Sequence, residues 1–178
     1  GNGPCHIVHP SNLAPALMVV DGMVKVTGGD RTQIEIADLY HLPENGIRSE
    51  HNLQPGEVIT DIVCGPSPTS GFYAIKEKQS FDWPLVFCCV SLEMSGSVIR
   101  KAKVCAGAVA PIPWRLHAVE AALEGVDPKD DAALRKACAG AAAGARPMSA
   151  NAYKTQLLPV ATRRAVLRAA GLPFEEGA

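Results

Sequence analysis

The sequence predicts an α+β fold, in which an antiparallel sheet is covered by helices on one face. Two observations support this prediction. Runs typical of β-strands fill the middle of the chain, and helical periodicity takes over beyond Pro113. Strands that precede helices as a block favour a sheet layered against helices over alternating strand and helix units. The 178 residues, 47% of them hydrophobic, are enough to bury a core as one domain or as two small ones.

The first part of the chain predicts a capped helix followed by a β-hairpin. Ser11 is a suitable N-cap for a helix over residues 13–20, and Pro15 is tolerated there only because it falls in the first turn. Alternating residues at 23–27 and 32–36 flank a turn containing two glycines and predict the hairpin. The following stretch, residues 37–56, is rich in Pro and Gly and predicts a loop with about one helical turn.

The rest of the chain predicts strands and then helices. Ser95-Gly96-Ser97 forms a tight link between the last two of four β-type runs, which cover residues 57–64, 71–78, 85–94 and 98–110. Three helices are predicted at 114–124, 130–143 and 151–170, with Gly125 as a C-cap and Asp130 near a helix N-terminus. The last helix is expected to turn Arg163, Arg164 and Arg168 toward solvent. Arg115 and Glu120 are expected to form a structural ion pair or a helix cap rather than to act as catalytic groups.

Composition excludes several classes of partner. A net charge of −1 gives no electrostatic footprint for nucleic acid or for an anionic membrane surface. No apolar run approaches the roughly 18–20 residues of a membrane span. Aromatic residues make up 5% of the chain, too few for a platform that stacks single-stranded nucleic acid. Neither a nucleic acid nor a membrane is therefore predicted as a partner.

The six cysteines predict reduced thiols rather than a disulfide framework. None of them has CxxC spacing, and they stand at positions 5, 64, 88, 89, 105 and 138. Cys88 and Cys89 are adjacent on a strand-like run, so their side chains should point to opposite faces of the sheet. This usage is typical of mostly buried thiols in a cytoplasmic protein.

The opening segment is the first candidate for a ligand site. A glycine-rich turn, Gly1-Asn2-Gly3, runs through a short apolar strand into the capped helix. Such a loop brings backbone N–H groups close to an anionic or polyhydroxyl ligand. The segment is interpreted as the downstream part of a ligand-binding protein whose first part lies upstream. Cys5, His6 and His9 lack a fourth ligand nearby, which favours a buried thiol and surface histidines over a metal site.

Five segments carry, in order, the motifs of one known family. They are HPSNLAPAL at residues 9–17, LQPGEVI at 53–59, GFYAIK with SFDWPLV at 71–86, GAVAPIPWR with EAALEG at 107–125, and NAYK at 151–154. Together they resemble the FAD-binding subunit of the molybdenum hydroxylases, which include the xanthine dehydrogenase, aldehyde oxidoreductase and carbon monoxide dehydrogenase flavoproteins. The resemblance implies that residues 1–50 end a PCMH-type FAD-binding domain. Residues 55–178 would then form an α+β domain like the C-terminal domain of the CO dehydrogenase flavoprotein.

The resemblance also implies four FAD contacts: Ser11, Asn12, Ile59 and Lys76. Asn12 stands where the family usually carries Asp, so it keeps hydrogen bonding to hydroxyls but loses charge-assisted bonds. Lys76 matches a lysine near the flavin ring, where a cation stabilises negative charge during reduction. The residues alone allow other roles: Ser11 and Asn12 as helix caps, Ile59 as a core residue and Lys76 as a solvated lysine. Asp82 is expected to brace the neighbouring strands or the flavin pocket.

As a function, the resemblance implies passage of electrons from iron–sulfur centres through FAD to an acceptor such as NAD or O₂. The partners would be an iron–sulfur subunit with [2Fe–2S] centres and a subunit that carries molybdopterin. This chain itself would contribute no catalytic side chain and no metal ligand, although Cys5 is a candidate ligand of an additional cluster. The alternative is a docking and shielding module that cannot hold FAD without the missing N-terminal part of its domain.

Overall fold

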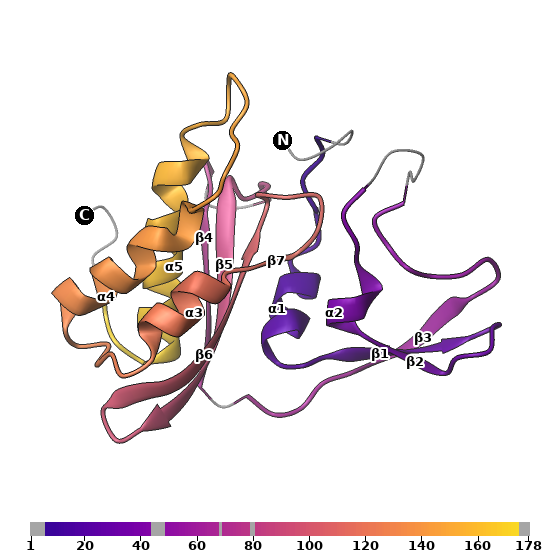
Figure 1. The fold of residues 1–178 in the computed structure, drawn as a ribbon, viewed down its shortest axis with the longest axis horizontal. Helices are drawn as coiled ribbons and strands as arrows, with labels where there is room; N and C mark the ends of the chain where they lie inside the picture. Colours follow the sequence, from indigo (N-terminus) through magenta and orange to yellow (C-terminus); the bar gives the residue numbers. More distant parts are fainter. Residues whose placement is uncertain (1–5, 44–48, 68, 79–80, 175–178) are drawn as a thin grey trace.

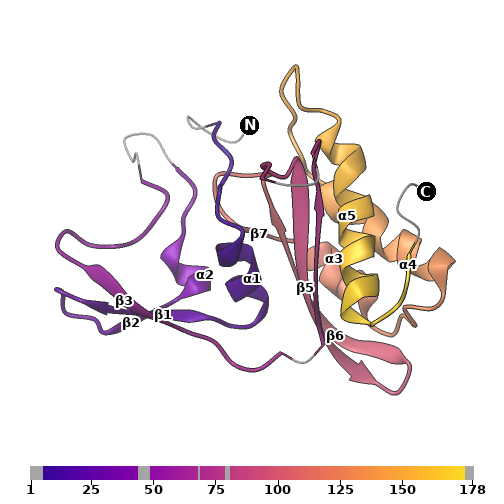
Figure 2. The same ribbon diagram turned by 180° about the vertical axis from the view of Figure 1, so that it is seen from behind.

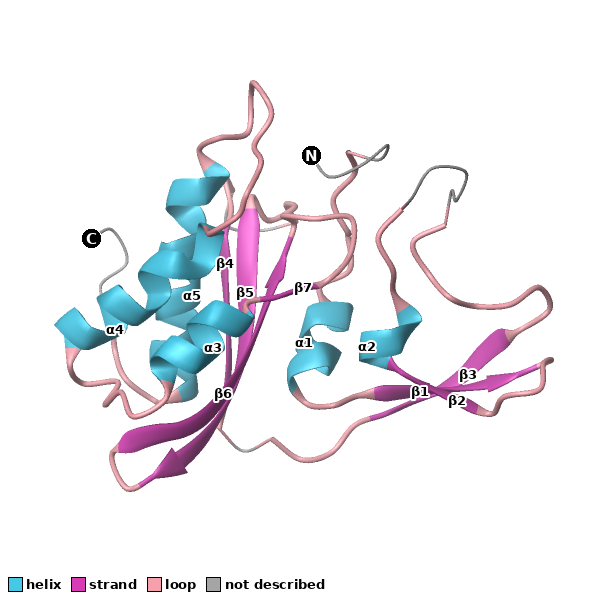
Figure 3. Ribbon diagram, viewed as in Figure 1, coloured by secondary structure: helices cyan, strands magenta, loops and turns pink. Residues whose placement is uncertain are grey.

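The structure, a computed structural model, describes residues 6–43, 49–67, 69–78 and 81–174. Within these ranges the chain forms a small sheet and a larger one, both antiparallel, with helices packed against them (Figures 1 and 3). The glycine turn at residues 1–3 and Cys5 lie outside the described residues. The predicted α+β class is confirmed, because the two sheets contain antiparallel strands and the helices form separate layers.

The small sheet is built from the first part of the chain. Its strand order is β2-β1-β3, and two helices accompany it. The elements in chain order are α1 (Leu13–Val19), β1 (Met23–Thr27), β2 (Gln33–Glu35), α2 (Ile36–Leu39) and β3 (Val58–Val63). The predicted helix, hairpin and single helical turn are all present within one or two residues of their expected bounds.

Strand β3 lies in the small sheet, whereas the sequence grouped it with the later strands. It pairs antiparallel with β1, placing Val24 opposite Ile62, and a bulge interrupts the register between Lys25 and Val26. It is an edge strand, and all six of its residues are exposed. A long connection that follows β3 carries the chain to the large sheet (Figure 1). The division of the chain at residues 50–55 into two domains stays a prediction.

The large sheet and its helices form the second part of the chain. The strands lie in sequence order: β4 (Ser70–Ile75), β5 (Val86–Ser95), β6 (Val98–Gly107) and β7 (Trp114–Arg115). One face is covered by α3 (His117–Leu123), α4 (Asp131–Cys138), the short 3₁₀ helix η1 (Ala139–Ala142) and α5 (Lys154–Ala169), as Figure 2 shows from behind. Gly96, with φ +60°, makes the predicted tight link between β5 and β6.

Several details of the predicted helices are wrong. The helix predicted at 130–143 ends at Cys138, where η1 follows it. Trp114 and Arg115 pair with Ala106 and Cys105 as strand β7, so α3 starts only at His117. Residues 151–153 form turns, and α5 starts at Lys154. Arg164 is buried at 8% exposure, because its guanidinium lies 5.2 Å from the centre of the Tyr73 ring and donates a hydrogen bond of 2.8 Å to the Tyr73 hydroxyl.

Strand β5 contributes to two cores, one on each face of the large sheet. Cys88 lies in the larger core, between the sheet and helices α3 to α5, while Cys89 lies in a smaller core with α1 and the first hairpin. The predicted opposite orientation of the two thiols is therefore confirmed. Phe87 extends the smaller core beside Cys89. Packing on both faces explains why Val86–Val90 is apolar at every position rather than at every second one.

Gly107 is required by the side chain opposite it. Phe87 pairs with Gly107 across β5 and β6, and its ring fills the space where a Cβ atom at position 107 would lie. The ring is 1% exposed and packs at a centroid distance of 5.6 Å from Phe72. A larger residue at position 107 would force Phe87 out of the smaller core.

We predict that Gly107→Ala destabilises the fold by about 1–3 kcal/mol, the usual cost of overpacking a filled core. The free energy of unfolding, measured by denaturant titration, checks this. Gly140→Ala is the matched control, because an added Cβ there meets no atom within 4 Å. Equal stability of the two variants would contradict the proposed packing constraint.

Candidate functional site

The start of α1 brings two of the predicted ligand contacts together. The Ser11 hydroxyl accepts hydrogen bonds from the backbone N–H groups of Leu13 (3.2 Å) and Ala14 (3.1 Å), so it caps the helix. Asn12 is exposed, and its side chain makes no capping hydrogen bond. Ser11 therefore fixes the helix start, while the Asn12 amide faces outward with its donors and acceptor available to a ligand.

His9 lies next to this helix start and is not the surface histidine that the sequence predicted. It is half-buried, its ring stands edge-on to Tyr40 at 4.8 Å between centroids, and its backbone N–H donates to the Ala110 carbonyl at 2.8 Å. Burial lowers the pKa of His9, which favours the neutral ring. Its Nε2 is buried without a hydrogen-bond partner among the described residues. His6, by contrast, is exposed as predicted.

Lys76 lies at the same end of the large sheet as the start of α1. It directly follows Ile75, which pairs with Val86; the next residue of β5, Phe87, pairs with Gly107 at the end of β6. The segment after Gly107 receives the hydrogen bond from His9. Lys76 is exposed, and no described carboxylate forms an ion pair with it. These pairings place the end of β4, the end of β6 and the segment that leads into α1 at the same end of the large sheet.

Ile59 is not brought to this end. It lies in β3, pairs with Val26 of β1 and is 39% exposed. Figure 1 shows β3 on the opposite side of α1 from β4. The alternative role of Ile59 as a core residue does not describe its environment, because β3 has no buried position.

An ion pair that sequence reasoning missed holds the chain just before β3. Arg31, in the turn of the hairpin, donates from Nε and Nη2 to the two carboxylate oxygens of Glu57, each at 2.7 Å. Glu57 also accepts from the backbone N–H of Gln54, and its side chain is 1% exposed. These hydrogen bonds, led by the one from Arg31, lower the pKa of Glu57 to about 2. The Glu of the LQPGEVI motif therefore fixes the entry into β3.

Asp82 braces its own loop rather than the neighbouring strands. Its carboxylate accepts hydrogen bonds from the backbone N–H groups of Lys78 (3.1 Å) and Trp83 (2.9 Å) within the connection from β4 to β5. Phe81 in this loop has φ +51°, and its side chain is fully exposed. The predicted contact of Asp82 with adjacent strands does not appear among the described hydrogen bonds.

The predicted pair of Arg115 and Glu120 is confirmed as structural. Arg115 Nε donates to Glu120 Oε1 at 2.7 Å, and the same oxygen accepts from the backbone N–H of Val104 at 2.7 Å. Burial alone would raise the pKa of Glu120, but the hydrogen bonds from Arg115 and Val104 keep it below its ordinary value. The carboxylate therefore ties β7 and α3 to β6.

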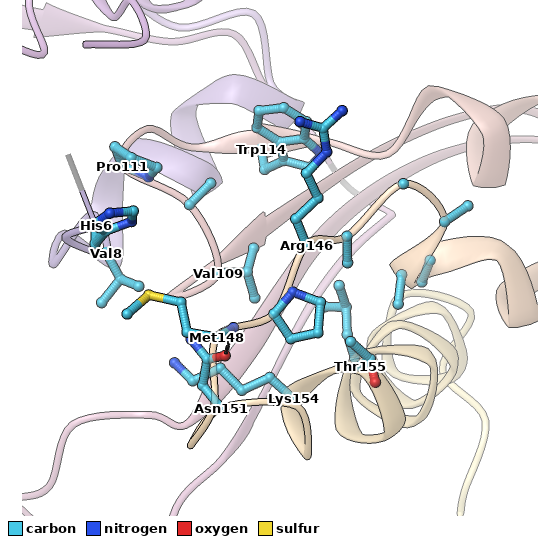
Figure 4. A pocket seen from close by; sticks show the side chains of 18 of the residues that line it. His6, Val8, Val109, Pro111, Trp114, Arg146, Met148, Asn151, Lys154 and Thr155 are labelled. Atoms are coloured by element: carbon cyan, nitrogen blue, oxygen red, sulfur yellow. Dashed lines mark hydrogen bonds between the residues drawn. The ribbon is translucent and has the colours of Figure 1, made fainter. Parts of the chain in front are cut away.

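A cavity of about 150 Å³ opens near the start of α5. Its walls come from residues 6–8, residues 109–114, the chain from Ala141 to Met148, and the first turn of α5 (Figure 4). Lys154 donates from Nζ to the Ala108 carbonyl at 2.8 Å along one side of it. Sequence reasoning missed the cavity because residues 139–143 were predicted as the end of a helix, whereas residues 139–142 form the 3₁₀ helix η1 and a loop follows.

The cysteines that the structure describes carry no sign of a metal centre. Cys88, Cys89, Cys105 and Cys138 are buried, and burial raises the pKa of each thiol, to about 12 for Cys89 and Cys138. Cys64 is exposed. Among the described residues, no three His, Cys, Asp or Glu side chains are grouped as metal ligands. The candidate cluster ligand Cys5 lies outside that part of the chain.

No helix in the described part of the chain combines the length and apolar character needed to cross a bilayer.

Comparison with known proteins points to one family. Residues 71–169 match the CO dehydrogenase flavoprotein C-terminal domain. The chain is 32% identical over 124 residues to the aldehyde oxidoreductase FAD-binding subunit PaoB of Escherichia coli (strain K12). That match covers 67% of this chain and 37% of PaoB. The chain therefore spans little more than a third of this relative.

Solved structures show the same fold. CO dehydrogenase from Oligotropha carboxidovorans is similar with a TM-score of 0.75 and 26% identity, covering 91% of this chain and 57% of that one. Quinoline 2-oxidoreductase from Pseudomonas putida 86 is similar with a TM-score of 0.78 and 18% identity, covering 93% and 58%. At that lower identity, the second likeness concerns the fold alone.

We predict that Glu57→Gln destabilises the fold at neutral pH and that the difference from the unaltered chain shrinks as the pH falls. The pKa of Glu57 is about 2 in the folded chain, below its ordinary value of 4.5. Its contribution is therefore complete above about pH 4.5 and is lost as the pH falls toward 2. Unfolding free energies across this pH range check the prediction.

The matched control for this test is Glu124→Gln, at an exposed glutamate outside the ion pair. It should leave both the stability and its pH dependence unchanged. If Glu57→Gln behaved like Glu124→Gln, Glu57 would have no role in fixing the entry into β3.

Proposed function

The chain belongs to the CO dehydrogenase flavoprotein C-terminal domain family, as its motifs predicted. We propose, from this membership, that the chain is part of the FAD-binding subunit of a molybdenum hydroxylase. In this role it passes electrons from iron–sulfur centres through FAD to an acceptor such as NAD or O₂. Its partners are an iron–sulfur subunit with [2Fe–2S] centres and a subunit that carries molybdopterin. PaoB, to which the chain is similar, is an FAD-binding subunit of an aldehyde oxidoreductase.

The observation that carries the proposal is the unused hydrogen-bonding capacity at the start of α1. The Asn12 amide is exposed, and the buried Nε2 of His9 has no partner among the described residues. Buried polar atoms normally find a partner, so an orphaned one indicates a group that belongs beside it. FAD offers hydroxyl and phosphate oxygens, which match an amide and an imidazole as partners. The residues present therefore fit this cofactor.

Each proposed contact has a separate task. Ser11 holds the start of α1 in place through its two capping hydrogen bonds, so that Asn12 is presented outward. Asn12 hydrogen-bonds FAD hydroxyls, and Lys76 supplies positive charge at the same end of the sheet, which favours the reduced flavin. FAD, when bound, supplies the electron transfer itself. We assign none of the described side chains a part in bond breaking.

Ile59 contacts FAD through its backbone and its apolar side chain in this proposal. Such a contact requires another segment to cover β3. Its apolar neighbours Val58, Ile62 and Val63 are 39–59% exposed, on a strand that has no partner along one edge among the described residues. An apolar edge strand is normally paired or protected. We propose that a further FAD-binding segment pairs with β3 and completes the small sheet. The match to PaoB covers 37% of that protein, so the relative contains additional sequence that can include such a segment.

The alternative is a docking and shielding module. In this role the large sheet and its helices contact the other subunits, and the chain by itself does not hold FAD. The complete burial of residues such as Val104, Leu123 and Leu134 favours this alternative, because the second part of the chain has a closed core that needs no cofactor.

The two functions differ in whether the chain alone retains flavin. We expect the purified chain to be colourless and to bind FAD in stoichiometric amount only when an N-terminal FAD-binding segment is supplied in trans, because β3 would then be covered. Visible absorption of the flavin after gel filtration measures this. Failure to retain FAD even with that segment would leave the docking role. A stoichiometric yellow protein from the chain alone would contradict the need for the added segment.

We predict that Lys76→Met, in the complete FAD-loaded subunit, lowers the flavin reduction potential by about 30 mV. This shift corresponds to about 1.4 kcal/mol for a two-electron reduction, an energy of the size expected when one nearby cation stabilises the reduced flavin. Lys78→Met is the matched control, because both lysines are exposed and lie two positions apart. Equal shifts, or none, in a spectroelectrochemical titration would place Lys76 away from the flavin.

A further inference from the structure

The cavity beside α5 holds a positive charge that nothing described in the chain compensates. Lys154 is half-buried on its wall, and burial lowers the pKa of its amine. Its hydrogen bond to the Ala108 carbonyl engages a neutral acceptor. No described carboxylate forms an ion pair with it. Partial burial of an unpaired ammonium is costly, and an anion beside it would offset that cost.

The remaining walls suit the apolar body of a small molecule. Trp114, Val109 and Met148 present apolar surface, and a run of alanines from 141 to 143 lines the same space. Arg146 extends toward Trp114 on the side of the cavity away from Lys154 (Figure 4). No Asp or Glu is found among the described residues that line it. The lining therefore combines apolar walls with two cationic side chains, a combination that favours an organic anion over a cation or a neutral polar molecule.

Local hydrogen bonds order the loop before α5 and the start of α5, which line the cavity. The Asn151 side chain accepts from the backbone N–H of Met148 at 2.7 Å, which anchors the loop before α5. The first N–H groups of α5 donate to the preceding turn, so the helix start itself offers no free donors to an anion: Lys154 N–H binds the Asn151 carbonyl and Thr155 N–H the Ala152 carbonyl. The positive charge in this cavity therefore comes from the side chains of Lys154 and Arg146, of which Lys154 is half-buried and Arg146 is exposed.

We propose that this cavity binds a small aromatic carboxylate, with its ring against the walls formed by Trp114 and the alanines and its carboxylate at Lys154. The volume of about 150 Å³ is comparable to that of a cavity that accommodates benzene. None of its lining residues is among the four proposed FAD contacts. The proposal therefore extends beyond the flavin function and does not depend on it.

Benzoate is the probe, and Trp114 is the reporter. The chain has two tryptophans, Trp83 and Trp114, so Trp83→Phe in the full chain leaves Trp114 as the only indole. Benzoate should change Trp114 fluorescence saturably. Benzamide, which has similar shape but no charge, should bind about tenfold more weakly, because it lacks a charge-assisted hydrogen bond to Lys154.

Two lysine variants test whether benzoate binds at Lys154. Lys154→Met, which keeps an apolar side chain of similar length, should weaken benzoate binding about tenfold and leave benzamide binding unchanged. Lys136→Met, at an exposed lysine of α4 away from the cavity, should bind both probes as the parent does. Should Lys154→Met fail to fold, as judged by circular dichroism, the comparison of benzoate with benzamide in the parent decides. Any of three results would overturn the proposal. They are a Trp114 fluorescence change that does not saturate below about 10 mM benzoate, benzamide binding as tight as benzoate binding, and a loss of benzoate affinity in Lys136→Met equal to that in Lys154→Met.

Discussion

Burial of both faces of β5 is the constraint on which the rest of the structure depends. Five consecutive residues, Val86–Val90, are buried, and they alternate between the core under α3 to α5 and the core under α1. A strand that is apolar on both faces has to be covered on both. Helix α1 is therefore fixed on the large sheet, although it belongs to the first part of the chain. Because α1 is fixed, its start lies at the end of β6, where His9 meets Ala110.

The segment after β6 connects the two candidate sites. Ala108 has φ +61°, a backbone conformation that costs a non-glycine residue about 1–2 kcal/mol. Its carbonyl accepts the hydrogen bond from Lys154, and the Ala110 carbonyl accepts the one from His9. A strained segment of this kind persists only when its surroundings hold it in place. The sequence GAVAP therefore positions the start of α1 on one side and the cavity beside α5 on the other.

Local signals predicted most of the fold, and long-range pairing accounts for most of the errors. Ser11 as a cap, Gly96 as a tight turn and the alternation of Cys88 and Cys89 follow from spacing alone. The partner of β3 does not, because a strand pattern carries no information about which strand it will join. Trp114 and Arg115 fit helical periodicity but pair with β6 instead. For the site, motifs suggested Asn12 and Lys76, whereas the orphaned Nε2 of His9 and the cavity at Lys154 depend on burial that only the structure provides.

The two parts of the chain differ in how completely they bury their apolar residues, and this difference bears on function. Leu123, Leu134 and Val166 are fully buried between the large sheet and its helices. In β3, by contrast, Val58 and Ile62 are at least half exposed. Folding free energy comes mainly from apolar burial, so the second part of the chain is stabilised by its own core, while β3 gains stability only when something covers it. In the proposed function, flavin binding and completion of the small sheet are coupled, because the segment proposed to cover β3 also fixes Ile59 for its proposed contact with FAD.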